Sequence, residues 1–515
     1  MSDIYRYWNE VKIFFKKNPW LYEVAVFVIM LILYLPLQMG KGFADPDSFY
    51  HLKMAELIAA HGPVRNFIWM PYTTLATAFA DQHFLYHVAL IPFIKWFGPF
   101  PGMKIATAFF AAFAVTALAW AMRYMGIRYA AVFAFMAGIM NPFLFRIGLS
   151  KASALGVAFL LVGLALAAKR RTWPLAAVVF LYVWTHGSWP ALVGLGTVVI
   201  IIISWNGNLR STFYILRSSL VALWSGAVLG VVINPFFPQN LRFYWEQIVQ
   251  IAVINYQSKI GVGAEWYPYL PAKLAGDLPL LCLMVIVAVA IFPVVVSRAV
   301  KNGRREPLRL AAALSLCAGA FLILTLRSQR HVEYFVPLAV AAAAAWFSEF
   351  RAPALPAAAR RALVSLLVVC GILAMVAVYA GNGLAKARRD LAGNYSFTLY
   401  QKAAEYLKKN SAPGEIIVHA DWDDMPPLFY WDDQNRYIMG LDPTFMYRAG
   451  PGRYWDYVNF TLGKSTDPVG VMKELDSRYV LADRVHRELD AMLARSGKFT
   501  LVYADNEAEI YLLKQ

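Results

Sequence analysis

Long apolar runs, separated by short and often basic turns, fill most of the first 380 residues. A hydrocarbon core about 30 Å thick takes about 20 apolar residues of helix to cross. Runs near this length predict a polytopic α-helical membrane protein. The eleven predicted spans lie near 22–39, 104–121, 129–147, 152–168, 173–186, 189–204, 216–234, 279–297, 310–326, 332–347 and 362–380.

Basic residues set the predicted orientation, because Lys and Arg collect in cytoplasmic loops. With the amino end inside, every strongly basic turn falls on the inner side. The segment 84–98 is short and interrupted by Pro92, and counting it as a span would move the basic turn 169–171 outside. We therefore interpret 84–98 as an external or re-entrant helix in a first outer loop, 40–103. The basic amino end lacks a small-residue cleavage site, which predicts a retained signal anchor.

The pattern changes after residue 380. Short apolar strand candidates alternate with helical patterns up to residue 515, which is typical of a soluble α/β domain. The predicted topology places this domain outside, together with loop 40–103 and a second long loop, 235–278. We therefore predict a transmembrane domain, 1–380, and an extracytoplasmic α/β domain, 381–515. The protein is expected in a cell inner membrane or a plasma membrane.

Charge and cysteine content exclude other classes. The net charge is +16, but residues 381–515 hold 17 basic and 19 acidic side chains, so the positive excess belongs to the membrane part. Basic cytoplasmic loops account for it, and no nucleic acid is expected as a partner. The three cysteines, Cys282, Cys317 and Cys370, all lie in apolar segments, so no disulfide framework is predicted.

Acidic residues are scarce in the membrane part, and carboxylates placed at a bilayer face tend to be functional. Asp45 and Asp47 follow the first apolar run. Asp45 precedes Pro46 and a helical run to Ala60, so it also suits a helix N-cap. Because a carboxylate can cap a helix with one oxygen, we hypothesise that Asp45 both caps the helix and serves a site.

Two further stretches carry candidate chemistry in the membrane part. Glu265 stands among Gly, aromatic and Pro residues in loop 235–278, which suits a segment that closes over substrate. An ordinary exposed glutamate is the alternative. Arg327 and Arg330 lie at an outer boundary, where two guanidinium groups can bind a diphosphate. They could equally reach to lipid headgroups, and Glu333 could pair with either.

In the α/β domain, Asp421, Trp422, Asp423 and Asp424 directly follow the first strand candidate. Loops at the carboxyl ends of strands usually hold the ligand contacts of open α/β sheets. The alternative is a turn of helix-capping aspartates in which Trp422 is a core aromatic.

Several of these stretches together resemble the catalytic subunit of oligosaccharyltransferase and its single-subunit relatives. Phe43-Ala44-Asp45-Pro46-Asp47-Ser48-Phe49-Tyr50 is similar to the first-loop motif of that family, and Gly263-Ala264-Glu265-Trp266-Tyr267-Pro268 to its fifth-outer-loop motif. Trp184-Thr185-His186-Gly187-Ser188 stands in the place of a Trp-Gly-Gly segment. Asp421-Trp422-Asp423-Asp424-Met425 resembles the Trp-Trp-Asp-Tyr-Gly signature.

The resemblance implies a C-type membrane glycosyltransferase fold with about 11–13 transmembrane helices and implies roles for the matching residues. Asp45 would touch a metal and the acceptor, Glu265 would be catalytic, and Arg330 would hold a lipid diphosphate. The segment around Trp422 would read the acceptor.

The chain departs from the family in two places. The second outer loop of the family supplies an Asp-x-Asp pair for the metal, whereas here the turn 146–152 has no acid. Arg146 or Lys151 could instead supply positive charge near the phosphate. The Trp-Trp-Asp signature is altered at its first, fourth and fifth positions, which leaves open whether the acceptor is an Asn sequon.

These observations predict a glycosyltransferase. It would move a sugar or oligosaccharide from a polyprenyl (di)phosphate carrier to a protein acceptor at the outer face, with membrane lipid as a further partner. Asp45 and Glu265 are the predicted catalytic carboxylates and the ligands of Mg²⁺ or Mn²⁺, with Asp47 in reserve. We predict that the donor phosphate is bound by Arg330, Arg327 and Lys151. We predict that the acceptor is bound by Trp422, Asp423 and Asp424.

Three alternatives remain. The acceptor could be lipid A, a polysaccharide or another hydroxyl compound. The protein could be an inactive substrate-binding subunit, as the missing second-loop acids suggest. A transporter is disfavoured because the acids collect at the outer surface rather than inside the spans.

Overall fold

The computed structural model describes residues 18, 20–205, 209–303, 305–350 and 381–514. These residues form two compact units. The first unit takes the described residues up to 40, then 104–230 and 267–392. The second takes 41–103, 231–266 and 393–514. The predicted domain boundary at residue 380 lies outside the described residues.

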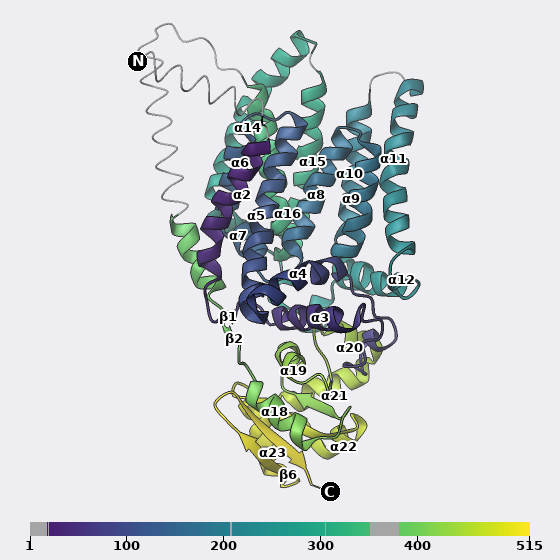
Figure 1. Cartoon of the computed structure of the whole chain (residues 1–515), viewed down its shortest axis with the longest axis vertical. Helices are drawn as coiled ribbons and strands as arrows, with labels where there is room; N and C mark the ends of the chain where they lie inside the picture. Colours follow the sequence, from purple (N-terminus) through teal and green to yellow (C-terminus); the bar gives the residue numbers. More distant parts are fainter. Residues whose placement is uncertain (1–17, 19, 206–208, 304, 351–380, 515) are drawn as a thin grey trace. The chain divides into compact units, whose positions relative to one another are not determined.

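The first unit is a bundle of helices, several of which run side by side (Figure 1). Length and apolarity allow four of the described helices to cross a membrane, or five if one bent pair counts as a single span. Shorter apolar helices supplement them. The helices are α2 (Trp20–Tyr34), α5 (Pro99–Met125), α6 (Ala130–Gly138), α7 (Asn141–Ile147), α8 (Ser153–Ala168), α9 (Thr172–Thr185), α10 (Trp189–Ser204), α11 (Leu209–Val232), α13 (Pro271–Asp277), α14 (Pro279–Lys301), α15 (Arg305–Arg327) and α16 (Val332–Glu349), with the 3₁₀ turns η1 (Leu35–Gln38) and η6 (Gln329–His331).

Most predicted spans coincide with helices, but the predicted span over 129–147 is not a single straight helix. This segment forms α6 and α7, which are bent by 80°. Pro142 stands in the first turn of α7, and Met140 before it is extended, with ψ of 112°. Proline cannot continue the preceding helix because its ring opposes the backbone of the turn before it. The predicted span 362–380 lies outside the described residues.

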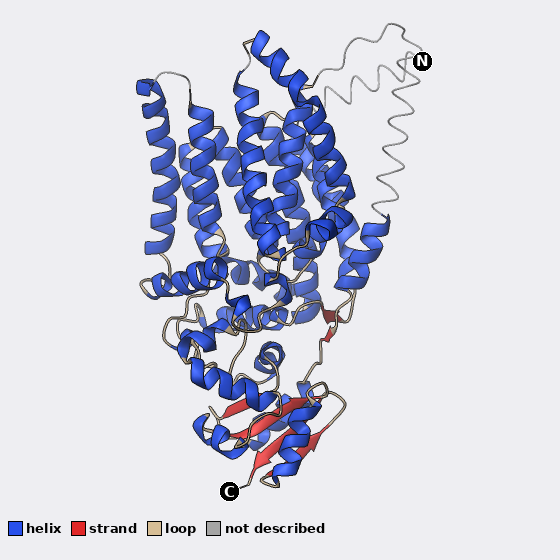
Figure 2. Ribbon diagram, turned by 180° about the vertical axis from the view of Figure 1, so that it is seen from behind, coloured by secondary structure: helices blue, strands red, loops and turns tan. Residues whose placement is uncertain are grey.

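The second unit contains a sheet with helices around it (Figure 2). Within the described residues the sheet has five strands in the order β4-β3-β5-β7-β6. Strand β3 is parallel to β4 and β5, whereas β7 is antiparallel to β5 and β6. All four residues of β3 are buried, as expected for a central parallel strand. The strands are β3 (Ile416–His419), β4 (Arg436–Tyr437), β5 (Ser477–Asp483), β6 (Phe499–Ala504) and β7 (Ala508–Leu513).

The prediction of a sheet-containing carboxyl-terminal part is therefore confirmed, whereas residues 381–392 belong to the first unit. Its helices are α18 (Gln401–Asn410), η7 (Trp422–Asp424), α19 (Met425–Trp431), α20 (Thr444–Ala449), α21 (Pro451–Thr461), α22 (Pro468–Glu474) and α23 (Arg487–Ser496).

The second long loop, 235–278, is divided, because its residues 267–278 lie in the first unit. Residues 41–103 and 235–266 of the two long loops belong to the second unit. They contribute β1 (Gly42–Phe43), α3 (Asp47–His61), η2 (Thr74–Ala76), α4 (Phe84–Phe97), α12 (Gln239–Tyr244), the π-helix η3 (Trp245–Ile254), η4 (Tyr256–Ser258) and η5 (Ala264–Trp266). The helix predicted over 84–98 is observed as α4, which packs against α3.

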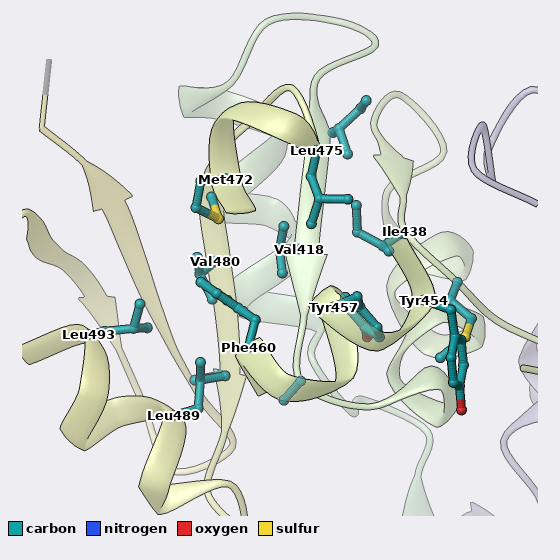
Figure 3. Close-up of a cluster of buried hydrophobic side chains, with 14 of the residues drawn as sticks. Val418, Ile438, Tyr454, Tyr457, Phe460, Met472, Leu475, Val480, Leu489 and Leu493 are labelled. Carbon is teal, nitrogen blue, oxygen red and sulfur yellow. The ribbon is translucent and has the colours of Figure 1, made fainter. Parts of the chain in front are cut away.

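One apolar core joins the second outer loop to the sheet. Side chains from β3, β5, α21 and α23 surround Val418, Tyr457 and Phe460 (Figure 3). Tyr256 and Ile260 of the loop are buried in the same cluster. Burial of each such side chain contributes about 1.5–3 kcal/mol, so the loop is held by the core that stabilises the sheet.

Polar contacts hold the first outer loop to the same unit. The indole Nε1 of Trp69 donates to the carbonyl oxygen of Asp433 at 2.7 Å, and the backbone N–H of Tyr437 donates to the carbonyl oxygen of Trp69 at 2.7 Å. Lys53 Nζ lies 3.1 Å from Asp433 Oδ2. The segment that starts at Asp45 therefore folds with the α/β part.

Candidate active site

Asp45 stands at the start of α3 and caps it. Its Oδ1 accepts a hydrogen bond from the backbone N–H of Asp47 at 3.0 Å. The helix begins at Asp47, with Pro46 as the N-cap residue, one position later than the sequence predicts. Because the cap occupies Oδ1, the geometry is consistent with a second oxygen that serves another partner.

A two-residue ladder brings a tyrosine to this carboxylate. Strand β1 pairs with β2 (Tyr395–Ser396), and Phe43 lies opposite Tyr395. A side chain at Gly42 would place Cβ 2.5 Å from the carbonyl oxygen of Tyr395, so the close approach requires glycine. Tyr395 therefore lies opposite Phe43, which is two residues before Asp45 in the sequence.

The hydroxyl of Tyr395 lies among carboxylates. It donates to Asp423 Oδ2 at 3.5 Å. Burial raises the pKa of Tyr395, and the negative charges of Asp423, Asp45 and Asp421 raise it further. The charges of Asp45 and of the aspartates that follow β3 therefore act on the same tyrosine. From the sequence, only the family resemblance linked these two stretches. Tyr395 itself was missed.

The segment that carries Glu265 borders the same loop. A Cβ added to Gly263 would lie 3.6 Å from the ring of Trp422. Trp266 is 5% exposed and anchors η5, whereas Glu265 is half-buried. The side-chain amide of Asn255 donates to the carbonyl oxygen of Trp266 at 3.3 Å. Trp422 thus packs beside the glutamate segment, as well as against the apolar core.

Asp424 differs from its two neighbours because it is buried. Its Oδ1 accepts from the Tyr400 hydroxyl at 2.8 Å, and its Oδ2 accepts from the backbone N–H of Asp421 at 2.8 Å. Burial raises its pKa to about 7, and the charge of Asp483 adds to this effect. These contacts match the alternative of a capping aspartate that supports the loop.

The first unit carries a buried ion pair near the predicted phosphate site. Arg146 Nε lies 2.9 Å from Glu333 Oε2, with side chains 9% and 1% exposed. Glu333 therefore pairs with Arg146 rather than with Arg327 or Arg330, the partners considered from the sequence. The charge of Arg146 is balanced within the pair.

His186, between α9 and α10, is fixed in one tautomer. The backbone N–H of Ser188 donates to His186 Nδ1 at 3.1 Å, so Nδ1 carries no proton and the neutral ring has its N–H at Nε2. Ser188 Oγ lies 2.6 Å from Nδ1. The hydroxyls of Tyr182 and Tyr334 lie 2.8 and 2.6 Å from Ser188 Oγ. Sequence reasoning placed this segment in the family but gave His186 no role.

The predicted phosphate-binding residues of the first unit lie at one end of its bundle. Lys151 is in the turn between α7 and α8, Arg327 is the last residue of α15, and Arg330 is in η6 between α15 and α16. The Arg146–Glu333 ion pair connects these two turns, and the Ser188–Tyr334 hydrogen bond adds the turn that holds His186. Arg327 is exposed, and Lys151 and Arg330 are half-buried.

A divalent metal ion would have few protein ligands. Within the described ranges no three His, Cys, Asp or Glu side chains are arranged to hold an ion. Mg²⁺ is often bound by one or two carboxylates together with substrate phosphates.

Comparison with known proteins identifies the fold. No protein-family model and no curated protein sequence matches the chain. Among solved structures, the archaeal oligosaccharyltransferase AglB from Archaeoglobus fulgidus, in complex with an inhibitory peptide and a dolichol-phosphate, is similar with a TM-score of 0.63 and 16% identity, over 91% of this chain and 70% of that one.

Two further solved structures are also similar to the chain in fold. ArnT from Cupriavidus metallidurans bound to undecaprenyl phosphate is similar with a TM-score of 0.54 and 16% identity, over 95% of this chain and 97% of that one. The arabinofuranosyltransferase AftD from Mycobacteria is similar with a TM-score of 0.59 and 14% identity, over 96% of this chain and 40% of that one. The chain is an integral membrane protein with the C-type membrane glycosyltransferase fold and a sheet-containing carboxyl-terminal part.

Proposed function

We propose that this protein is a membrane glycosyltransferase that moves a sugar or oligosaccharide from a polyprenyl phosphate or diphosphate to an acceptor at the outer membrane face. The observation that carries the proposal is the position of Tyr395, which lies opposite Phe43, two residues before Asp45, and donates to Asp423 Oδ2 at 3.5 Å. The similar structures support the donor class, because one holds a dolichol-phosphate and another undecaprenyl phosphate. The amino end would be cytoplasmic and the α/β part extracytoplasmic.

Asp45 and Glu265 are the proposed catalytic carboxylates. The carrier phosphate leaves readily, so the enzyme has to orient the acceptor, receive its proton and neutralise charge on the departing phosphate. One carboxylate oxygen of Asp45 accepts the backbone N–H of Asp47, and this hydrogen bond fixes the direction of the other oxygen. Asp47 is a reserve carboxylate one position further along the chain. A Mg²⁺ or Mn²⁺ ion held by Asp45 and Glu265 would supply positive charge beside the phosphate.

The donor phosphate would bind to the first unit through Arg330, Arg327 and Lys151. His186 adds a directed donor, because its network leaves Nε2 as the protonated ring nitrogen. A neutral imidazole N–H suits a phosphate oxygen without a further buried charge.

Trp422 and Asp423 would contact the acceptor, and Asp424 would hold their loop in place. We propose a protein acceptor. Because the family signature is altered here, a hydroxyl acceptor such as lipid A or a polysaccharide is the alternative.

The experiment is transfer by the purified protein in nanodiscs from radiolabelled polyprenyl-linked glycans to three acceptor pools: sequon peptides, lipid A and polysaccharide. Product in one pool identifies the acceptor class. Tight binding of undecaprenyl phosphate without product in any pool would contradict the transferase and favour an inactive substrate-binding subunit.

A further inference from the structure

A cavity of about 400 Å³ lies at one end of the helical bundle. It is bordered by the ends of α5, α8, α10 and α16 and by the start of α15. Four of these helices enclose it, because α8 packs against α10, α10 against α15, α15 against α16 and α16 against α8. The volume falls within the range of about 300–1,000 Å³ that is usual for ligand pockets. All lining residues belong to the first unit, so one compact part of the chain builds the cavity.

The cavity is at the end of the bundle opposite to the predicted phosphate-binding residues. Helix α15 begins beside the cavity and ends at Arg327, 23 residues later. Helix α8 begins two residues after Lys151 and ends at Ala168, which lines the cavity. A helix of the length of α15 spans about 35 Å, close to the thickness of a hydrocarbon core. The cavity is therefore separate from the proposed donor site.

The wall of the cavity combines buried apolar side chains with charges of both signs. Its apolar part includes three buried side chains, Ile127, Ala168 and Ala345. The charged side chains among the described lining residues are two of each sign, Lys169 and Arg170, and Glu306 and Glu349. Lys169 and Glu306 are exposed, and the other two are half-buried. Such a wall suits a ligand that carries both a negative and a positive group.

Arg170 is held in place but its guanidinium is not fully satisfied. Its backbone is left-handed, with φ of 55°, which is uncommon for a residue other than glycine. Its Nη2 donates to the carbonyl oxygen of Ile203, in the last turn of α10, at 2.6 Å. Its Nε is buried and has no hydrogen-bond partner among the described residues. A buried N–H without an acceptor is costly, and a phosphate oxygen in the cavity would supply one.

Helix capping explains only part of this arrangement. Arg170 supplies a donor to the carboxyl end of α10, and Glu306 in the first turn of α15 suits the dipole of that helix. Capping explains neither the unpaired Nε–H of Arg170 nor the cavity that this residue lines. A bound ligand accounts for both.

Exposed aromatic side chains surround this end of the bundle. Tyr129, Trp173 and Trp205 are 70%, 85% and 53% exposed. Each lies within three positions in the sequence of a residue that lines the cavity. Tyr and Trp collect where a membrane meets water, at the level of the lipid headgroups. The cavity therefore lies at headgroup level, which favours a lipid over a soluble ligand.

We propose that this cavity binds the headgroup of a phospholipid that carries both a phosphate and an ammonium group. Basic pockets between membrane helices bind phospholipid headgroups, and here Lys169 and Arg170 hold the phosphate. Glu306 accepts from the ammonium group, and Glu349 adds negative charge beside it. In the proposed orientation this lipid belongs to the cytoplasmic leaflet. The site goes beyond the proposed function and does not depend on it.

The test measures lipid binding to the delipidated full-length protein in detergent by native mass spectrometry. Phosphatidylethanolamine offers both groups, whereas phosphatidylglycerol lacks the ammonium group and phosphatidylcholine has a methylated one that cannot donate. Phosphatidylethanolamine should bind about 10-fold more tightly than either, and about 10-fold more tightly than soluble glycerophosphoethanolamine. Equal binding of phosphatidylglycerol overturns the role of the ammonium group. Equally tight binding of the soluble headgroup overturns the lipid as the ligand.

Variants assign the binding to the cavity. Lys169→Gln and Glu306→Gln change exposed side chains, so both should fold and each should weaken phosphatidylethanolamine binding about 10-fold. Glu306→Gln should leave phosphatidylglycerol binding unchanged. Arg171→Gln is the matched control, because Arg171 is outside the cavity lining and its Nε donates to the Tyr124 hydroxyl at 3.0 Å. Wild-type binding by both Lys169→Gln and Glu306→Gln, or an equal loss in Arg171→Gln, overturns the proposal.

Discussion

Phe43 pairs with Tyr395 across the β1–β2 ladder, although the two residues are 352 positions apart in the sequence. The pairing joins the stretch that leads into Asp45 to the start of the α/β part. Because Tyr395 also donates to Asp423, one side chain connects the two motifs on which the functional proposal depends.

The hydroxyl of Tyr395 should matter for transfer but little for folding. Tyr395→Phe keeps the ladder and loses one hydrogen bond, typically worth about 1 kcal/mol. We expect transfer to fall about 10-fold with the melting temperature within about 2 °C of wild type. Tyr503→Phe is the matched control, because Tyr503 donates to Asp505 at 2.5 Å on the sheet. An equal loss of transfer in both variants would argue against a role for Tyr395.

Arg146 and Glu333 should stabilise the first unit only when both side chains are present. Removal of one partner leaves a buried charge, which costs about 3–5 kcal/mol. Arg146→Met and Glu333→Leu should each lower the melting temperature, and the double variant should recover most of the loss. Losses that simply add in the double variant would show that the two side chains do not interact.

The protonated Nε2 of His186 should increase the affinity of the protein for a lipid phosphate. His186→Asn can still accept from the backbone N–H of Ser188 but loses the far donor, so affinity for undecaprenyl phosphate should fall about 10-fold. Thr197→Val on α10 is the control, because the Thr197 hydroxyl donates within its own helix to the carbonyl oxygen of Val193 at 2.7 Å. Unchanged binding by His186→Asn would remove His186 from the phosphate site.

Asp424 should make stability depend on pH. Its pKa is raised from 3.8 to about 7 in the folded state, so ionisation opposes folding. Its contribution is fully favourable below about pH 4 and is lost between pH 4 and pH 7, by roughly 4 kcal/mol for a shift of this size. Thermal unfolding of wild type and Asp424→Asn across this range measures the difference. A constant difference between the two proteins would contradict the raised pKa.

A metal ion at Asp45 and Glu265 should bind well only with the donor phosphate present. Mn²⁺ binding, followed by electron paramagnetic resonance, should strengthen at least 10-fold when undecaprenyl phosphate is added, and Glu265→Gln should abolish the increase. Chelation should then lower transfer, and Mg²⁺ should restore it. Full transfer in chelator would show that positive charge from Arg330, Arg327 and Lys151 suffices.

Local pattern was enough to predict most helices of the bundle and the five strands of the sheet, but not α19 to α22 or the strands β1 and β2. Apolar runs marked the bundle, and short β-branched runs such as 415–419 marked the buried parallel strands. The break at Met140 was missed because apolar residues continue through it, although Asn141-Pro142 carried the signal.

The site was predicted only where a motif lies within one short stretch. The capping of α3 by Asp45 followed from neighbouring residues. The Arg146–Glu333 pair and the Tyr395 contact join residues that local periodicity cannot bring together. Their contacts come from tertiary packing, which a single sequence does not encode in any local pattern.

The most direct test of the account compares wild type with Asp45→Asn and Glu265→Gln in transfer from polyprenyl-linked glycans to the acceptor pools. Asn at position 45 can still accept the N–H of Asp47, so it keeps the helix cap and removes only the charge. The account predicts loss of transfer by about 10²–10⁴-fold in both variants with wild-type melting temperatures. Transfer at the wild-type rate by folded Asp45→Asn and Glu265→Gln would contradict it.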